Sequence, residues 1–151
     1  MKISQTGIDL IKKFEGCELT AYFDGGGVAT IGYGDTGSVS EWDVENETTI
    51  TEERAEELLR EDIAWVEEAI NEHVIMGIKQ EHFDALCSFV YNLGETNFRT
   101  STLLRLLNQG LFQLVPEQFL RWKYDNGKIV KGLLRRRRAE AKLFEEGKIK
   151  T

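Results

Sequence analysis

The sequence predicts a mostly helical α+β fold of two lobes: a small N-terminal lobe with a short antiparallel sheet, a long connecting helix, and a helical C-terminal lobe. Three observations support this prediction. Half of the fourteen glycines lie between residues 15 and 37, among β-forming residues, which indicates tight turns between short strands. Apolar residues recur at helical spacing from about residue 51 to 72. Beyond them, glycines separate further helical segments.

Length and composition are those of one globular domain. The 151 residues are 41% hydrophobic and 30% charged, which is enough to bury a core. We expect a single domain over residues 1–151, with the N-lobe at about 12–50, the connecting helix at about 51–72 and the C-lobe at about 73–151.

No apolar run approaches the roughly 20 residues that span a membrane, and the first residues lack the apolar core of a signal peptide. We therefore expect a protein that stays in the cytoplasm and does not insert stably into a membrane.

Charge is distributed unevenly along a chain whose formal net charge is −7. Residues 45–72 hold eleven acids against two bases, and residues 121–151 hold eleven bases against four acids. The acidic block argues against a general nucleic-acid binder, and the arginine run 135–138 lacks an aromatic stacking platform nearby.

Cys17 and Cys87 fit no metal-ligand spacing, and a disulfide between them is possible but disfavoured in a reducing compartment. No metal, cofactor or nucleic-acid partner is expected.

The N-terminal elements follow from caps, turns and periodicity. Ser4 is a suitable N-cap for a first helix over residues 4–14, which ends near Glu15 and Gly16 and is expected to pack on the helical lobe. Two short strands are predicted on either side of a glycine loop, and a polar loop is predicted after them. These segments are residues 19–23, 28–33 and 35–50.

The later elements are predicted as helices. Thr51 caps the connecting helix, and Glu52 and Glu53 suit its N-terminus. Ser101 caps a short helix, and Pro116 suits the first turn of another. The remaining helical predictions are residues 81–93, 102–109 and 133–146, the last ending at Gly147.

Two isolated carboxylates beside the glycine-rich stretch are candidates for acid–base chemistry. Glu15 lies at a helix C-terminus, where the negative end of the dipole disfavours ionisation. Asp24, on a loop with many backbone N–H groups, should ionise easily, and the hydroxyl of Thr30 on the next strand can hold a water. A proton donor and a water-activating partner are what glycosidases need. Taken alone, the three residues also fit solvated or capping acids and an ordinary strand threonine.

The pattern E-x8-D-x5-T followed by IGYG resembles the catalytic signature of phage-type lysozymes, the endolysins of glycoside hydrolase family 24. Other segments resemble that family in the same order, from about residue 7 to 146. They are ITEERAEELLREDI for the helix between the lobes, and FDALCSFVYNLGE, STLLRLLNQG and FLRWKYDNGKIVKGLLRRRRAEAKLF for the helical lobe. The resemblance implies a two-lobed lysozyme-like fold.

The resemblance also implies an activity. The enzyme would be a muramidase that cuts the β-1,4 bond between N-acetylmuramic acid and N-acetylglucosamine in bacterial peptidoglycan. Glu15 would be the general acid, and Asp24 and Thr30 would position the attacking water for a single displacement with inversion. The glycan would bind between the lobes. The protein would act as a monomer, without a cofactor, after a separate membrane-permeabilising protein releases it from the host cytoplasm.

Further residues match the family pattern with less specificity. Tyr91 and Asn92 match positions that line the glycan site, although Tyr91 also fits core packing. Ser101 matches a glycan-contact position, although capping is a sufficient role for it. Trp122 is expected to be a core anchor. One arginine of the run 135–138 can reach Glu15, others can meet the anionic wall, and the plainest expectation is surface charge that pairs with Asp or Glu.

Two positions depart from the family pattern. Asp35 stands where the family usually has a histidine after GYG, and Asp62 matches a helix acid that can pair with that histidine. Because two acids should repel, we expect no direct hydrogen bond between them. Ala29 replaces an aromatic residue often found before the catalytic threonine, so looser packing around Thr30 is expected.

Two alternative functions are compatible with parts of the pattern. A lytic transglycosylase cleaves the same bond but forms an anhydro product, and it needs the acid but not the water-holding pair. The presence of both Asp24 and Thr30 favours hydrolysis. A catalytically silent wall-binding module is the other alternative, and the intact set of three candidate residues argues against it.

Overall fold

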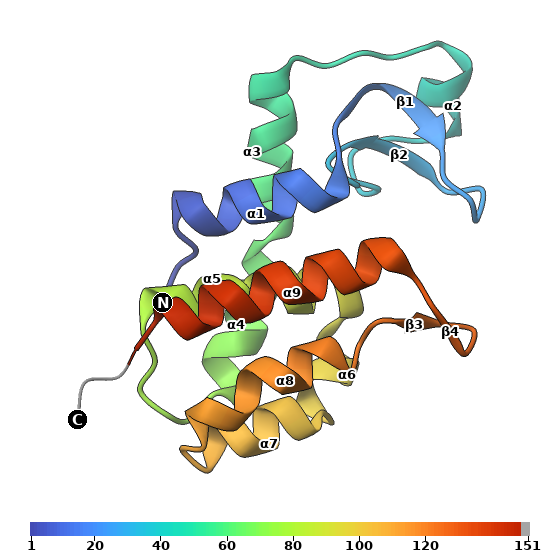
Figure 1. The fold of residues 1–151 in the computed structure, drawn as a ribbon. Helices are drawn as coiled ribbons and strands as arrows, with labels where there is room; N and C mark the ends of the chain where they lie inside the picture. The colour runs from blue at the N-terminus through green and yellow to red at the C-terminus, as the bar shows by residue number, and fades with distance from the viewer. Residues whose placement is uncertain (149–151) are drawn as a thin grey trace. The chain divides into compact units, whose positions relative to one another are not determined.

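The computed structural model describes residues 1–148, which divide into two compact units. One unit comprises Ile11–Ala64. The other, called here the helical unit, combines Met1–Leu10 with the described residues from Trp65 onward. The border between the two falls inside the first helix, α1 (Gln5–Glu15), which is drawn in blue in Figure 1. The expected mostly helical α+β class with small antiparallel sheets is confirmed.

The unit Ile11–Ala64 is built around a β-hairpin. Strands β1 (Glu18–Phe23) and β2 (Ala29–Gly32) pair in antiparallel fashion, with an irregularity in β1 before Tyr22. Helix α2 (Glu41–Glu45) packs against β1, and α3 (Glu52–Asp62) packs against β2. The hairpin and these helices share one small hydrophobic core, made by Ala21, Ile31 and Leu58 with Val39, Val44 and Ile50 against them.

The segment predicted as a loop, residues 35–50, is more ordered than expected. It contains α2, which a capping box starts: the Ser40 N–H donates to Asp43 Oδ2 at 2.8 Å. Asp43 also accepts a 2.9 Å hydrogen bond from the hydroxyl of Thr48. The Ser-x-x-Asp spacing of such a box is visible in the sequence. The helix itself has only five residues, which are too polar to show an apolar pattern of helical period.

The predicted connecting helix is two helices, α3 and α4 (Ala64–His73), with Ile63 between them. Thr51 caps α3 as expected, because its side chain accepts a hydrogen bond from the Arg54 N–H at 3.1 Å. The backbone of Ile63 still donates to the Leu59 carbonyl at 2.9 Å, so helical bonding reaches the interruption. The apolar periodicity predicted the extent of the segment but not this interruption.

The helical unit buries most of the large side chains of the chain. Helix α9 (Lys131–Glu146) packs against α5 (Gln80–Leu93) and α8 (Val115–Leu120). Phenylalanines from these three helices meet edge-to-face in the core. The other elements of this part of the chain are α6 (Glu95–Arg99), α7 (Thr102–Asn108), the 3-10 helix η1 (Phe112–Leu114), β3 (Tyr124–Asp125) and β4 (Lys128–Ile129).

The hairpin β3–β4 was missed at the sequence level. Its turn residues Asn126 and Gly127 both have positive φ, 50° and 77°. An Asn-Gly pair with that backbone is the preferred two-residue hairpin turn, so the signal was present in the sequence. Trp122, just before this hairpin, is half-buried and meets Phe89 edge-to-face at 5.8 Å between ring centroids, as expected of a core anchor.

A buried ionic cluster joins α9 to α5. The Glu140 carboxylate accepts hydrogen bonds from the Ser88 hydroxyl at 2.5 Å and from Arg137 Nη2 at 3.1 Å. Arg136 donates to the carbonyl of Ser88 at 3.1 Å. Burial raises the pKa of Glu140, although Arg137, Ser88 and Arg136 oppose that rise. The cluster therefore holds charge in a site from which water is excluded.

The arginine run is thus divided between two environments. Arg136 and Arg137 are buried, and both pair with Glu140, whereas Arg135 and Arg138 are exposed. The expectation that these arginines pair with an acid is correct for the middle two. The expectation that they lie on the surface is wrong for the same two, because α9 turns them toward α5.

Both cysteines are free thiols: Cys17 is exposed and Cys87 is buried. Burial raises the pKa of the Cys87 thiol, as expected of an inert core cysteine. Within residues 1–148, no helix is both long enough and apolar enough to cross a membrane.

The cluster makes a prediction about stability. Glu140→Gln leaves two buried guanidinium groups without their counter-charge, so the free energy of unfolding should fall by about 3–5 kcal/mol. Urea denaturation measures this loss. The control Glu146→Gln, at an exposed residue in the last turn of the same helix, should change stability by less than about 0.5 kcal/mol. A loss below about 1 kcal/mol in Glu140→Gln would mean that the two buried guanidinium groups do not need the charge of Glu140.

Candidate functional site

Glu15 is the last residue of α1 and is half-buried. The helix ends there because Gly16 adopts a positive φ of 70°, which an L side chain rarely adopts. The Gly16 N–H still donates to the Lys12 carbonyl at 3.1 Å. The helix end therefore places the Glu15 carboxyl directly before β1.

Asp24 occupies the turn between β1 and β2, and its side chain organises that turn. Its Oδ1 accepts hydrogen bonds from the N–H groups of Gly26, at 2.9 Å, and Val28, at 2.8 Å. The backbone N–H of Asp24 donates to the Val28 carbonyl at 2.9 Å. Because one carboxylate oxygen takes both backbone donors, the orientation of the exposed side chain is set locally.

Thr30 lies on β2, directly opposite Tyr22 on β1. Its side chain is buried, and its hydroxyl donates to the Val28 carbonyl at 2.8 Å. With its proton committed to that bond, the hydroxyl oxygen can act toward a further group only as an acceptor.

Tyr22 on β1 is influenced by the charges of both candidate acids. Burial raises the pKa of Tyr22, and the carboxylates of Glu18, Asp24 and Glu15 raise it further. Both candidate catalytic carboxylates thus act electrostatically on one phenol. Sequence reasoning missed Tyr22, and the available signal was its position two residues before Asp24 in an extended segment.

Ala29 lines an open pocket beside the hairpin. Phe23, Gly27 and Glu41 line it with Ala29, and its volume is about 470 Å³. Thr30 itself is buried, so the looser packing expected around it stays a prediction.

The other three candidate residues lie in the helical unit. Tyr91, half-buried, and Asn92, exposed, belong to the last turn of α5. Ser101 is buried and caps α7: its hydroxyl accepts from the Leu104 N–H at 3.0 Å and donates to the Phe98 carbonyl at 2.7 Å. The capping role expected for Ser101 is confirmed, and it uses most of the hydrogen-bonding capacity of the hydroxyl.

The chain is similar to proteins of known family over nearly its whole length. The model of the phage lysozyme family matches residues 12–140. The endolysin of Salmonella phage P22 is 46% identical over 144 residues, which are 95% of this chain and 98% of that protein. The chain belongs to the phage lysozyme family. It is accordingly an enzyme of the lysozyme class, as the motif resemblance implied.

Similar proteins also include a longer endolysin and two solved structures. The endolysin of Bacillus phage PZA is 43% identical over 149 residues, and the chain spans 56% of its length. A crystal structure of a P22 lysozyme mutant superposes with a TM-score of 0.87 at 43% identity, covering 96% of this chain and 99% of that one. The muramidase domain of SpmX from Asticaccaulis excentricus gives a TM-score of 0.86 at 37% identity, covering 95% and 97%.

The expectation that Asp35 and Asp62 of this phage lysozyme avoid each other is wrong, because their side chains are hydrogen-bonded. Burial raises the pKa of Asp62, and donation to Asp35 and the charges of Asp35 and Glu61 raise it further, to about 7. For Asp35, hydrogen bonds from Asp62, Ser38 and the Gly37 backbone outweigh the effect of burial and lower the pKa. The two acids share one proton instead of repelling.

The correction has a physical reason. Asp35 is buried, and its Oδ1 already accepts from the Ser38 N–H at 2.9 Å and from the Ser38 hydroxyl at 2.5 Å. These donors hold Asp35 as the ionised partner, so Asp62 carries the proton. A coupled pair of this kind titrates as a unit. The sequence showed two acids but not the Ser38 donors that give them different protonation states.

The shared proton makes the stability of this phage lysozyme depend on pH. An unfolded aspartate has a pKa of about 3.9, so between about pH 4 and 7 the folded state binds more protons through Asp62 than the unfolded state does. The free energy of unfolding should therefore fall as pH rises through that window. In Asp62→Asn the amide donates to Asp35 without titrating, so this part of the fall should disappear.

The measurement is urea unfolding at pH 5 and pH 8. After allowance for solvent screening of the half-buried Asp62, the wild type should lose about 1 kcal/mol more than Asp62→Asn between the two pH values. The control Glu53→Gln, an exposed acid on the first turn of the same helix, should keep the wild-type dependence. An equal or steeper fall in Asp62→Asn would show that the pair does not hold a proton near neutral pH.

Proposed function

We propose that this phage lysozyme is a muramidase that hydrolyses the β-1,4 bond between N-acetylmuramic acid and N-acetylglucosamine in bacterial peptidoglycan. The observation that supports this most directly is the placement of Glu15, Asp24 and Thr30 in one compact unit, in which the backbone of Val28 orients both Asp24 and Thr30. The similarity to phage endolysins and to a muramidase domain also supports it. We further propose that it acts as a monomer on the cell wall during host-cell lysis.

In the proposed mechanism, Glu15 is the general acid. Its proton passes to the glycosidic oxygen as the bond to the sugar carbon breaks, so that the leaving group departs as a neutral hydroxyl. The end of α1 supports this role, because it places Glu15 directly before β1 and in the same compact unit as Asp24 and Thr30.

Asp24 and Thr30 would hold the attacking water. The Oγ1 of Thr30 donates to Val28 and so offers a lone pair to one water proton. The Oδ1 of Asp24 is held by the turn, which leaves Oδ2 as the oxygen proposed to take the second proton as the water attacks. Attack from the face opposite the leaving group inverts the anomeric carbon, and this geometry keeps the two carboxyl groups roughly 6.5–9.5 Å apart.

Residues of the helical unit would bind the glycan strand. The exposed amide of Asn92 can donate to and accept from an N-acetyl group, and Tyr91 beside it offers a ring face and a hydroxyl. A glycan contact by Ser101 stays a prediction, because its hydroxyl already caps α7.

Glu15→Gln should lower turnover at least about 100-fold, because the amide cannot donate the proton that the leaving group needs. Clearing of a cell-wall suspension measures this. Glu18→Gln is a matched control, since it makes the same charge change on an exposed residue of β1 and should retain activity. Retained clearing in Glu15→Gln would remove Glu15 from the role of general acid.

The water-holding pair makes a separate prediction. Asp24→Ala should nearly abolish turnover, and Thr30→Val should weaken it with the fold intact by circular dichroism, because valine keeps the shape but loses the hydroxyl. Thr30→Ser restores the hydroxyl and should recover part of the activity. Unfolding of Thr30→Val, or full activity in Asp24→Ala, would contradict these roles.

Product chemistry separates hydrolysis from the transglycosylase alternative. Digestion of peptidoglycan in ¹⁸O-labelled water should give reducing ends that carry one labelled oxygen, detected by mass spectrometry. Rapid NMR of the new reducing end should show the α-anomer first if the displacement inverts. Anhydro ends without label would overturn the hydrolase assignment, and a β-anomer formed first would overturn inversion alone.

A further inference from the structure

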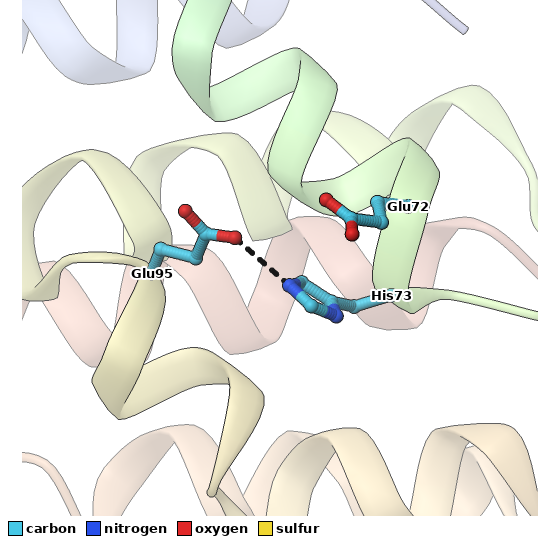
Figure 2. Close-up of side chains that lie close together, drawn as sticks. All are labelled: Glu72, His73 and Glu95. Atoms are coloured by element: carbon cyan, nitrogen blue, oxygen red, sulfur yellow. Dashed lines mark hydrogen bonds and ion pairs between the residues drawn. The ribbon is translucent and has the colours of Figure 1, made fainter.

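Two acidic side chains and a histidine converge in the helical unit, where α4 ends and α6 begins (Figure 2). Glu72 and His73 are the last two residues of α4, and Glu95 is the first residue of α6. One potential ligand atom from each side chain lies within 4.8 Å of the other two. The Nε2 of His73 is 2.9 Å from Oε1 of Glu95. Three metal-binding groups from two helices thus face one small space.

The surrounding residues hold the histidine in place. Its ring meets Phe98 edge-on, with centroids 6.5 Å apart, and only 18% of its side chain is exposed. The carbonyl of His73 accepts from Asn108 Nδ2 at 2.9 Å, and Asn108 Oδ1 accepts from the Ile75 N–H at 3.0 Å. Asn108 therefore clamps the end of α4. A ligand that is already oriented loses little conformational entropy when it binds an ion.

Local charge at this position favours a cation. The C-terminal end of α4 carries the negative end of the helix dipole, and two carboxylates add to it. A simpler explanation is a surface ion pair between protonated His73 and Glu95. That pair needs only two of the three side chains, so Glu72 is the residue that distinguishes the two explanations.

We propose that Glu72, His73 and Glu95 form a binding site for a divalent transition-metal ion, with zinc as the best match. Imidazole nitrogen and carboxylate oxygen bind Zn²⁺ at about 2.0–2.2 Å, and three protein ligands leave one tetrahedral position for water. Magnesium and calcium prefer shells made only of oxygen, so the imidazole selects against them.

The site needs only small side-chain movements to bind the ion. Two ligand atoms on one tetrahedral zinc stand about 3.3 Å apart. The contact between His73 and Glu95, at 2.9 Å, must open slightly, and the exposed carboxylate of Glu72 must move inward by rotation about its side-chain bonds. Bound zinc would join the end of α4 to the start of α6, and so stabilise the helical unit according to its occupancy.

The test measures the thermal unfolding of the EDTA-treated protein at pH 7.5, before and after addition of ZnCl₂, together with calorimetric titration of zinc. With zinc at about 100 times its dissociation constant, one site should raise the melting temperature by about 5–10 °C. Magnesium at the same concentration should give no comparable rise. The measurement does not depend on lytic activity or on the residues proposed for catalysis.

Three variants decide the assignment. His73→Gln can still donate a hydrogen bond to Glu95 but lacks the imidazole nitrogen, so the zinc response should be lost. Glu72→Gln should weaken zinc binding at least about ten-fold, because it removes a ligand that the ion pair does not use. Glu68→Gln, an exposed acid one turn earlier on α4, is the matched control and should respond as the wild type does.

The proposal is overturned by any one of three outcomes: no zinc response in the wild type, an unchanged response in His73→Gln, or equal losses in Glu68→Gln and Glu72→Gln. The last would indicate general attraction of the cation to an acidic surface. Loss of the zinc response in His73→Gln and Glu72→Gln, but not in Glu68→Gln, supports a site.

Discussion

The buried carboxylate of Glu140 is the constraint on which the helical unit depends. A charge without solvent is tolerable only if its partners occupy fixed positions, and here these are Arg136 and Arg137 on α9 and Ser88 on α5. An apolar contact could slide along the helix, but these bonds cannot, so they set the register of α9 on α5. The same bonds hold α9 against the helix whose last turn carries Tyr91 and Asn92.

The candidate catalytic unit is held by shorter-range bonds. The Asp24 carboxylate and the Thr30 hydroxyl are both oriented by groups within four residues along the chain, chiefly the backbone of Val28. This turn therefore forms its geometry without help from distant parts of the chain. Glu15 is positioned differently, because the helix that carries it ends at Gly16. The proposed acid and the proposed water-holding pair are thus positioned by independent local structures, and the charges of both carboxylates raise the pKa of Tyr22.

The pair Asp35–Asp62 shows how one unseen donor changes an electrostatic conclusion. Repulsion between two acids assumes that both are ionised. Ser38 and the adjoining backbone stabilise the charge on Asp35 alone, so Asp62 keeps a proton and the pair becomes a hydrogen bond. In the unit Ile11–Ala64 this hydrogen bond thereby stands where a histidine would form an ion pair. The bond needs the proton on Asp62, so it is present at neutral or acidic pH and weakens at higher pH.

The sequence by itself determined the fold class, the family and most helices, because glycine turns, caps and apolar periodicity are local properties. It also indicated three candidate catalytic residues, through the resemblance of one short segment to the family signature, and their roles stay a proposal. It did not reveal the interruption at Ile63, the burial of Arg136 and Arg137, the protonation of Asp62, or the meeting of Glu72, His73 and Glu95. The tertiary structure decided these features, since charge, burial and ligand geometry depend on side chains that lie far apart in the sequence.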